Sequence, residues 1–167
     1  MFVLGHLGIG SFIAKPWRTG LPRRALLIGT LLPDLIDKPL YYLASAWSGE
    51  HGYGIITGTR TFGHTAIFNL TLASAMFLSK SKTLAALTLG VATHLLLDGI
   101  GDHFKGSLVS IPLLWPFTGT SFPDYPYSNY AQHFGTILQP FIIYSEILGT
   151  LLLITEFYPK RMGKRPN

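Results

Sequence analysis

The stretch T-L-A-A-L-T-L-G-V-A-T-H-L-L-L-D-G-I, residues 83–100, contains only two ionisable side chains in a long apolar run. His94 and Asp98 are four residues apart, so on a helix they share one face, where an imidazole nitrogen and a carboxylate oxygen can bind one cation. A buried carboxylate is costly unless a partner compensates its charge. The pair therefore predicts either a divalent-metal site or a core histidine hydrogen-bonded to its own helical neighbour.

The composition of the whole chain indicates a membrane protein. Charged residues make up 13% of the 167 residues and hydrophobic residues 48%, whereas ordinary soluble domains carry about 25% charged residues. No polar or low-complexity linker divides the chain, so we expect one domain over residues 1–167. The chain has no cysteine, which leaves His, Asp, Glu and water as metal ligands.

Five apolar stretches predict an all-α membrane bundle with three to four spanning helices and a short N-terminal helix. They lie near residues 2–14, 25–46, 63–79, 83–100 and 137–158, and a spanning helix needs roughly 20 residues. Three basic clusters separate or follow them: Lys15, Arg18, Arg23 and Arg24; Lys80 and Lys82; Lys160, Arg161, Lys164 and Arg165. The positive-inside rule puts these clusters in the cytoplasm, and segments 47–62 and 101–136 outside.

The basic residues also indicate the partner. They form short clusters between apolar runs rather than one polar face, so the net charge of +5 favours contact with the lipid bilayer over nucleic acid, which we do not expect to bind. The N-terminus has no basic residue before its apolar stretch, unlike a secretory signal peptide, and we expect it to be retained.

Polar residues from all five stretches are predicted to lie in one layer of the membrane. Counting about 1.5 Å per helical residue from the nearest cytoplasmic basic residue places each of them about 13–24 Å deep. The six residues are His6, Asp34, His64, His94, Asp98 and Glu146. Such convergence is what a metal site in a helical bundle requires. A set of interhelical hydrogen bonds is the alternative.

Two acidic positions have competing interpretations. Asp34 follows Pro33, which can break or restart a helix and free backbone groups beside the carboxylate. Asp37 either shares the face of Asp34 and acts as a ligand, or forms a surface ion pair with Lys38. Glu146, in the middle of the last stretch, needs a buried partner and is either a ligand or general base, or one half of an interhelical hydrogen bond.

The remaining candidates are basic. Arg60 lies four residues before His64, where a guanidinium suits a phosphate or another anionic group, although a snorkelling interfacial arginine has the same pattern. His51 and His103 are expected in loops, and Asp102 with His103 is close enough to Asp98 to join a second metal position. His133 is expected to be structural or interfacial.

The segment after residue 106 is rich in turn formers and aromatic residues, with Trp115 and several tyrosines suited to the membrane interface. We expect it either to cap a site or to act as an exposed anchoring loop.

The order of these motifs resembles the YdjM-like, LexA-regulated family of membrane-bound metal-dependent hydrolases, which is related to the zinc-dependent phospholipase C and P1 nuclease superfamily. The resemblance rests on an early histidine, G-T-L-L-P-D-L-I-D at residues 29–37, H-L-L-L-D at 94–98, L-L-W-P-F at 113–117 and a late glutamate. It also includes T-R-T-F-G-H-T at 59–65, where the family pattern usually reads H-R-x-x-T-H-S, so Thr59 stands in place of a histidine.

The resemblance implies an all-helical protein of a bacterial or archaeal cytoplasmic membrane that binds divalent metal, with zinc expected, and hydrolyses an ester or phosphoester. Zinc would lower the pKa of a bound water to about 7. We expect His64, His94 and Asp98 to form the core of the site, and Asp34 and His6 to complete a second metal position or orient the first.

The catalytic groups are expected to be Asp37 or Glu146, which would take the proton from water, and Arg60, which would neutralise a phosphate oxygen in the transition state. A site facing the outer side of the membrane favours a lipid or amphipathic substrate. The alternatives are a non-enzymatic membrane protein, such as a metal or proton transporter or a scaffolding bundle, and a soluble helical zinc enzyme.

Overall fold

The computed structural model describes residues 2–104, 111–124, 135 and 138–158. In this part of the chain the fold is all-α, as expected, and contains no strand. Its six α-helices are α1 (Val3–Ile13), α2 (Arg23–Gly29), α3 (Leu32–Ser48), α4 (Ala66–Ser79), α5 (Lys82–Phe104) and α7 (Pro140–Phe157), and two short 3-10 helices are η1 (Phe62–His64) and η2 (Ile111–Leu114).

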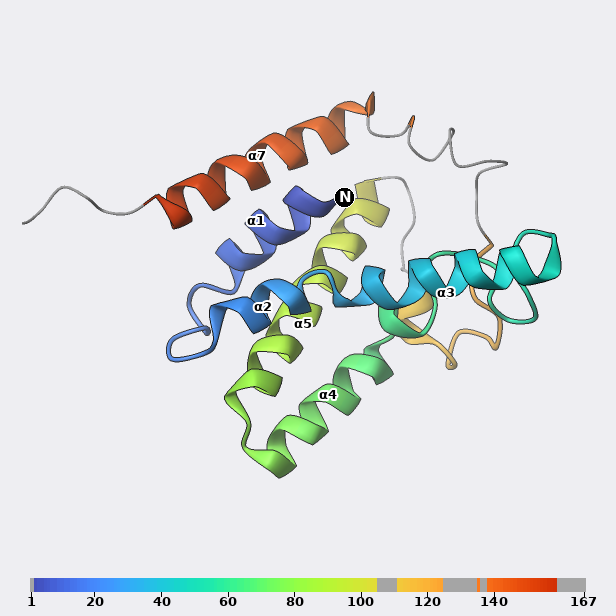
Figure 1. Ribbon diagram of the computed structural model, residues 1–167, viewed down its shortest axis with the longest axis horizontal. Coiled ribbons are helices and arrows are strands. Elements are labelled where there is room, and N and C mark those ends of the chain that lie inside the picture. Colours follow the sequence, from blue (N-terminus) through green and yellow to red (C-terminus); the bar gives the residue numbers. More distant parts are fainter. Residues whose placement is uncertain (1, 105–110, 125–134, 136–137, 159–167) are drawn as a thin grey trace, which may run out of the picture.

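Helix α5 is the central element and contacts α1, α2, α3 and α4 (Figure 1). Helix α4 forms an antiparallel hairpin with it through a turn at Lys80, which adopts a left-handed conformation. Helix α7 lies along α1 and runs in the same direction, whereas α3 points away from the hairpin (Figure 1). Side chains of α1, α3 and η1 can therefore meet those of α5.

The ends of several helices meet at the cytoplasmic side expected from the basic clusters. Ala14, Leu26 and Ala86 are buried together there, beside Ala25. The guanidinium groups of Arg18 and Arg23 both pair with the carboxylate of Glu156, in the last turn of α7. These contacts join the α1–α2 connection to the end of α7.

The apolar stretch expected over residues 25–46 is two helices rather than one. Helix α2 ends at Gly29 and α3 begins at Leu32, with Pro33 in its first turn. Proline has no backbone N–H and fits only at the start of a helix. The prediction that Pro33 interrupts or restarts the helix is confirmed.

Two of the described helices, α5 and α7, are long and apolar enough to cross a membrane, by length and composition. Helices α1, with 11 residues, and α4, with 14, are apolar but shorter. The expected three to four spans thus become two candidates. The physical reason is that the Pro33 break and the η1 turn shorten the stretches that the sequence shows as continuous.

Helices α1 and α7 touch backbone to backbone. A Cβ at Gly149 would overlap the carbonyl group of Leu4, and one at Gly8 would overlap the carbonyl group of Gly149. Only glycine fits at this contact. The approach brings Glu146, one turn before Gly149, to the first turn of α1.

Candidate metal centre

The ring orientations of His64 and His94 are fixed by their Nδ1 atoms. His94 Nδ1 donates to the Thr30 carbonyl at 2.8 Å, and His64 Nδ1 donates to Asp37 Oδ2 at 2.7 Å. A neutral imidazole carries one proton, so in the neutral form of both rings the Nε2 atom presents a bare lone pair. These two Nε2 atoms lie 3.2 Å apart, an arrangement that is repulsive unless a cation lies between or beside them.

Two carboxylates face the same pair of nitrogens. Asp34 Oδ1 lies 3.6 Å from His64 Nε2, and Asp98 Oδ2 lies 3.5 Å from His64 Nε2 and 3.7 Å from His94 Nε2. Neighbouring ligands of a tetrahedral zinc ion, each about 2.0–2.1 Å from the metal, are about 3.3 Å from each other. The observed separations are thus close to those that a bound divalent ion would need.

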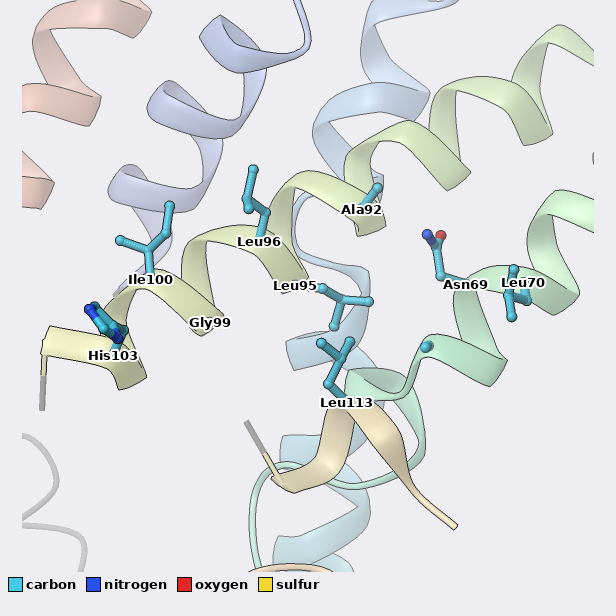
Figure 2. Close-up of a pocket in the computed structure, with 10 residues that line it drawn as sticks. Asn69, Leu70, Ala92, Leu95, Leu96, Gly99, Ile100, His103 and Leu113 are labelled. Atoms are coloured by element: carbon cyan, nitrogen blue, oxygen red, sulfur yellow. The ribbon is translucent and has the colours of Figure 1, made fainter. Parts of the chain in front are cut away.

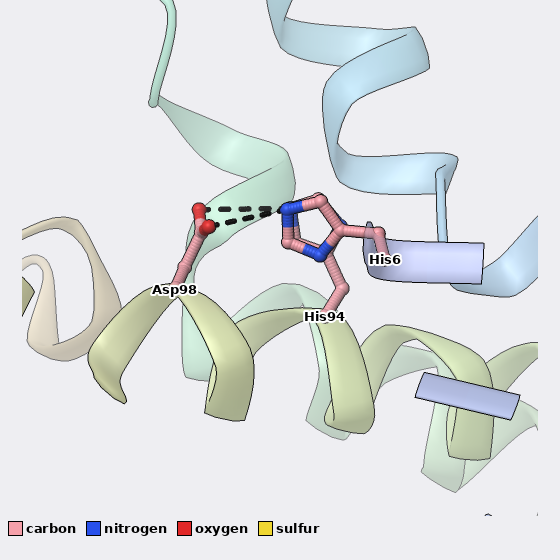
Figure 3. Close-up of side chains that lie close together, drawn as sticks. All are labelled: His6, His94 and Asp98. Carbon is pink, nitrogen blue, oxygen red and sulfur yellow. Dashed lines mark ion pairs between the residues drawn. The ribbon is translucent and has the colours of Figure 1, made fainter. Parts of the chain in front are cut away.

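His6 adds a third imidazole from α1. Its ring stacks on that of His94 with centroids 4.0 Å apart, and its Nε2 lies 3.3 Å from Asp98 Oδ1 (Figure 3). His6 Nδ1 is buried and has no hydrogen-bond partner in the described part of the chain. Such an orphaned nitrogen is a further available ligand atom.

Two groups of side chains could therefore hold a metal ion, and they share His94: His6, His94 and Asp98, and Asp34, His64 and His94. We call the five residues of these two groups the His/Asp cluster. Its three histidines and Asp98 are at most 5% exposed. The structure brings all five sequence-predicted ligands together, from α1, α3, η1 and α5.

Asp37 is a partner of His64 and not a surface residue. Its carboxylate is fully buried and accepts hydrogen bonds from the backbone N–H groups of Thr61, Gly63 and His64, in addition to His64 Nδ1. Of the two alternatives considered for Asp37, the surface ion pair with Lys38 is wrong, because Lys38 pairs with Asp34 instead. Carboxylates that orient a metal-binding imidazole in this way are typical of metal sites.

The close approach of η1 to α3 needs a glycine. A Cβ at Gly63 would lie 3.0 Å from the Cα and carbonyl oxygen of Pro33 and 3.2 Å from Asp37 Oδ1. Thr65, two residues on, caps α4 by accepting a hydrogen bond from Phe68 N at 3.0 Å. The motif around His64 thus ends the connection between α3 and α4 and leads directly into α4.

Arg60 is bound on the other side of the cluster. Its Nη1 donates to both carboxylate oxygens of Asp102 at 2.8 Å, and its Nη2 lies 3.0 Å from Asp98 Oδ2. Burial lowers the pKa of this guanidinium, but the neighbouring carboxylates of Asp98 and Asp102 together raise it above its ordinary value. The interfacial snorkelling that we considered for Arg60 does not describe these contacts.

The charges around the cluster do not balance. Four carboxylates, those of Asp34, Asp37, Asp98 and Asp102, meet two cations, Lys38 and Arg60. With neutral imidazoles, the described residues carry an excess of two negative charges. One divalent cation would compensate it.

Glu146 is not part of this cluster. Its Oε1 accepts hydrogen bonds from the backbone N–H groups of Phe2 and Gly5 at 2.9 and 3.0 Å, and its Oε2 accepts one from Leu4 at 2.9 Å. A carboxylate at the positive end of a helix is well placed in this way. The expected ligand or general-base role finds no geometric support, and the alternative of an interhelical hydrogen bond matches these contacts.

The other histidines lie outside the cluster. His51 Nδ1 lies 3.2 Å from the hydroxyl of the buried Tyr41. His103 belongs to the last turn of α5, and not to a loop as expected. His133 is outside the described residues.

An apolar groove of about 590 Å³ lies between α4 and α5 (Figure 2). Leu95 and Gly99 line it and directly follow His94 and Asp98, and His103 and Asn69 are its polar residues. None of the five cluster residues lines the groove. It is therefore a separate feature on another face of α5.

The described part of the aromatic segment packs beside the cluster. Trp115 and Phe122 both contact Phe62 of η1, with ring centroids 5.8 and 5.1 Å away, and Thr57 Oγ1 donates to the Phe122 carbonyl at 3.3 Å. Because Phe62 is two residues from His64, this segment supports η1. The tyrosines from residue 125 to 130 lie outside the described residues.

Sequence reasoning missed two contributors. One is the Thr30 carbonyl, which the helix break at Pro33 makes available to His94. The other is Lys38, which the i, i+4 spacing from Asp34 could have revealed.

Comparison with known proteins identifies the family. No curated protein and no solved structure matches the chain. The family model described as YdjM inner membrane protein matches residues 1–161. Since this match covers nearly the whole sequence, the chain belongs to the YdjM inner membrane protein family.

Proposed function

We propose that the protein is a metal-dependent hydrolase of the inner membrane that cleaves an ester or phosphoester bond. The observation that carries the proposal is the pair of Nε2 atoms of His64 and His94, 3.2 Å apart and beside two carboxylates. A divalent ion would supply positive charge to the facing nitrogens and to the carboxylates beside them.

The residues fit a divalent ion with nitrogen and oxygen ligands, and zinc is the metal whose chemistry suits them. His64, His94 and Asp34 would hold it, and His6 with Asp98 would complete a second position or share the first. When bound, such an ion lowers the pKa of its water to about 7 and polarises the bond to be cleaved.

The other residues hold this geometry. Asp37 keeps His64 in the tautomer that offers Nε2 to an ion, and Thr30 does the same for His94. Asp37 does not have the lone pairs free for the proton-accepting role expected from the sequence, because four N–H groups already occupy its oxygens. Asp37 is therefore a positioning residue in this proposal. Glu146 lies outside the cluster and accepts from three backbone N–H groups of α1 and the residue before it.

Metal content and hydrolysis together test the proposal. Protein purified in detergent is loaded with zinc or manganese, analysed for bound metal, and assayed with a chromogenic phosphodiester and a carboxylic ester. His94→Ala should lose metal and activity, whereas His103→Ala, the same change on the same helix outside the cluster, should keep both. Equal metal content in these two variants would reject the site.

The same purified protein can distinguish a metal transporter from a hydrolase. Protein that binds metal stoichiometrically, hydrolyses neither ester and moves the metal across liposome membranes would favour transport over hydrolysis.

We also propose that the cluster faces the outer side of the membrane, since the basic clusters of the α1–α2 connection and the α4–α5 turn belong in the cytoplasm. The chain has no cysteine, so a single introduced cysteine is the only thiol that can be labelled. A membrane-impermeant maleimide applied to intact spheroplasts should label Glu50→Cys but not Ser81→Cys. The reverse pattern would overturn this orientation.

A further inference from the structure

We propose that Lys38 and Arg60 form an anion-binding pair at the His/Asp cluster that selects a phosphoester substrate over a neutral ester. The inference rests on the proposed function and narrows its substrate class. It rests on two contacts: Lys38 on α3 pairs with Asp34, and Arg60 before η1 pairs with Asp98. Both carboxylates belong to predicted metal ligands.

Each cation pairs with one of these carboxylates. Lys38 Nζ lies 2.7 Å from Asp34 Oδ2, and the other oxygen of Asp34 faces His64 Nε2. Arg60 Nη2 lies 3.0 Å from Asp98 Oδ2, the oxygen that also faces His64 and His94. Each cation thus pairs with a carboxylate that faces the imidazoles, Lys38 from α3 and Arg60 from the segment before η1.

The exposure of these side chains places them where solvent reaches the cluster. The side chains of Lys38 and Arg60 are each 29% exposed, whereas those of His64, His94 and Asp98 are at most 6% exposed. Lys38 and Arg60 are therefore more exposed than the five residues of the cluster. An isolated i, i+4 pair such as Asp34–Lys38 is common on helix surfaces, but a second cation against the same cluster is not explained by helical spacing.

Both cations retain donors for an anion. An ammonium group has three N–H donors and a guanidinium has five. In the described contacts Lys38 donates one hydrogen bond to Asp34, and Arg60 donates two from Nη1 to Asp102 and forms an ion pair with Asp98 through Nη2. A metal ion bound by Asp34 and Asp98 would share the carboxylates that pair with Lys38 and Arg60, and would weaken both ion pairs.

This arrangement matches a phosphoryl group. A phosphate ester carries two or more charged oxygens that can each accept a charge-assisted hydrogen bond, and arginine and lysine are the residues that bind such groups. A neutral carboxylic ester or amide offers no charge for either cation. Asp102, which holds Arg60 through two hydrogen bonds, fixes the direction of the guanidinium.

Inorganic phosphate is the probe for this pair. Its affinity for the metal-loaded protein in detergent is measured by calorimetry, with acetate as the comparison anion, for the wild type, Lys38→Met and Arg60→Lys. Each variant should bind phosphate roughly tenfold more weakly or worse, as expected for a charge-assisted hydrogen bond, and should keep its metal. Lys80→Met, at the exposed α4–α5 turn, is the matched control and should bind phosphate as the wild type does.

A kinetic measurement adds a second readout. Lys38→Met should raise KM for a phosphodiester and leave KM for a neutral carboxylic ester unchanged. Arg60→Lys keeps the charge but loses the planar fork, so it remains informative if removal of the charge at Arg60 prevents folding.

The outcomes separate the two proposals. If the wild type holds no metal, the proposed function fails and this inference fails with it. If it holds metal and phosphate affinity is the same in the wild type, Lys38→Met and Arg60→Lys, only the anion-binding pair is rejected. Acetate bound as tightly as phosphate, with the same sensitivity to both variants, would also reject the selection of phosphoesters.

Discussion

Glu146 and the carboxylates of the His/Asp cluster look alike in the sequence, as acidic residues in apolar stretches, and differ in what surrounds them. Glu146, at the junction of α1 and α7, is met by three backbone N–H groups of the first turn of α1. At the His/Asp cluster, Lys38 and Arg60 pair with carboxylates, but the Nε2 atoms of His64 and His94 face each other and those same carboxylates.

The comparison shows that a carboxylate in an apolar helix does not by itself indicate a metal. A buried acceptor with enough donors is satisfied without an ion. A group of acceptors that face one another is not. Changes at the cluster should therefore affect metal binding, and changes at the α1–α7 junction should affect only stability.

The largest effect is expected for His64→Ala. The change removes an Nε2 ligand atom and leaves Asp37 buried without its imidazole partner, so zinc should bind more weakly by more than the roughly 10–100-fold typical of an outer partner. Competition with a fluorescent zinc chelator measures this. An affinity within twofold of the wild type would show that His64 is no ligand.

Asp37→Asn should have the next largest effect on the metal. An amide keeps the size of the side chain but cannot accept from all four donors as a carboxylate does, so the tautomer and orientation of His64 are less well fixed. We expect a roughly 10–100-fold loss of zinc affinity, measured with the same chelator. A loss of folding stability without any change in zinc affinity would limit Asp37 to a structural role.

At the α1–α7 junction, Gly149→Ala should separate the helices, because the added Cβ would overlap the Leu4 carbonyl. We expect destabilisation of about 1–3 kcal/mol, seen as a lower Tm in detergent, with metal content close to that of the wild type. Gly99→Ala on α5 is the control, since a Cβ there meets nothing within 4 Å and should be neutral or slightly stabilising. Equal behaviour of the two variants would contradict the backbone contact.

The smallest effect is expected for Glu146→Gln. The amide removes the negative charge at the start of α1 and one of the two acceptors, so the free energy of unfolding should fall by about 1–2 kcal/mol. Zinc stoichiometry should not change. If the variant folds normally but binds no zinc, Glu146 contributes to the metal site, and the distinction between the two regions is wrong.

Much of the candidate site could be predicted from the sequence, because the positions of its residues can be counted along helices. His6, Asp34, His64, His94 and Asp98 come from separate stretches, and only a folded bundle brings them together. The i, i+4 spacing of His94 and Asp98 gives their shared face directly.

The roles of the acidic residues could not be predicted in the same way. Whether Asp37 or Glu146 is available for chemistry depends on backbone N–H groups far away in the chain, those of residues 61–64 and 2–5. No local pattern encodes these partners. The division of residues 25–46 into two helices was missed for a related reason, since the chain stays apolar across the break at Thr30.

X-ray absorption spectroscopy at the zinc edge tests the central claim most directly. Protein loaded with one equivalent of zinc should show two or more imidazole ligands together with carboxylate oxygens, at about 2.0–2.1 Å from the metal, and His94→Ala should remove imidazole scattering. Zinc bound without imidazoles, or no stoichiometric zinc at all, would contradict the claim that the facing Nε2 atoms of His64 and His94 share a cation.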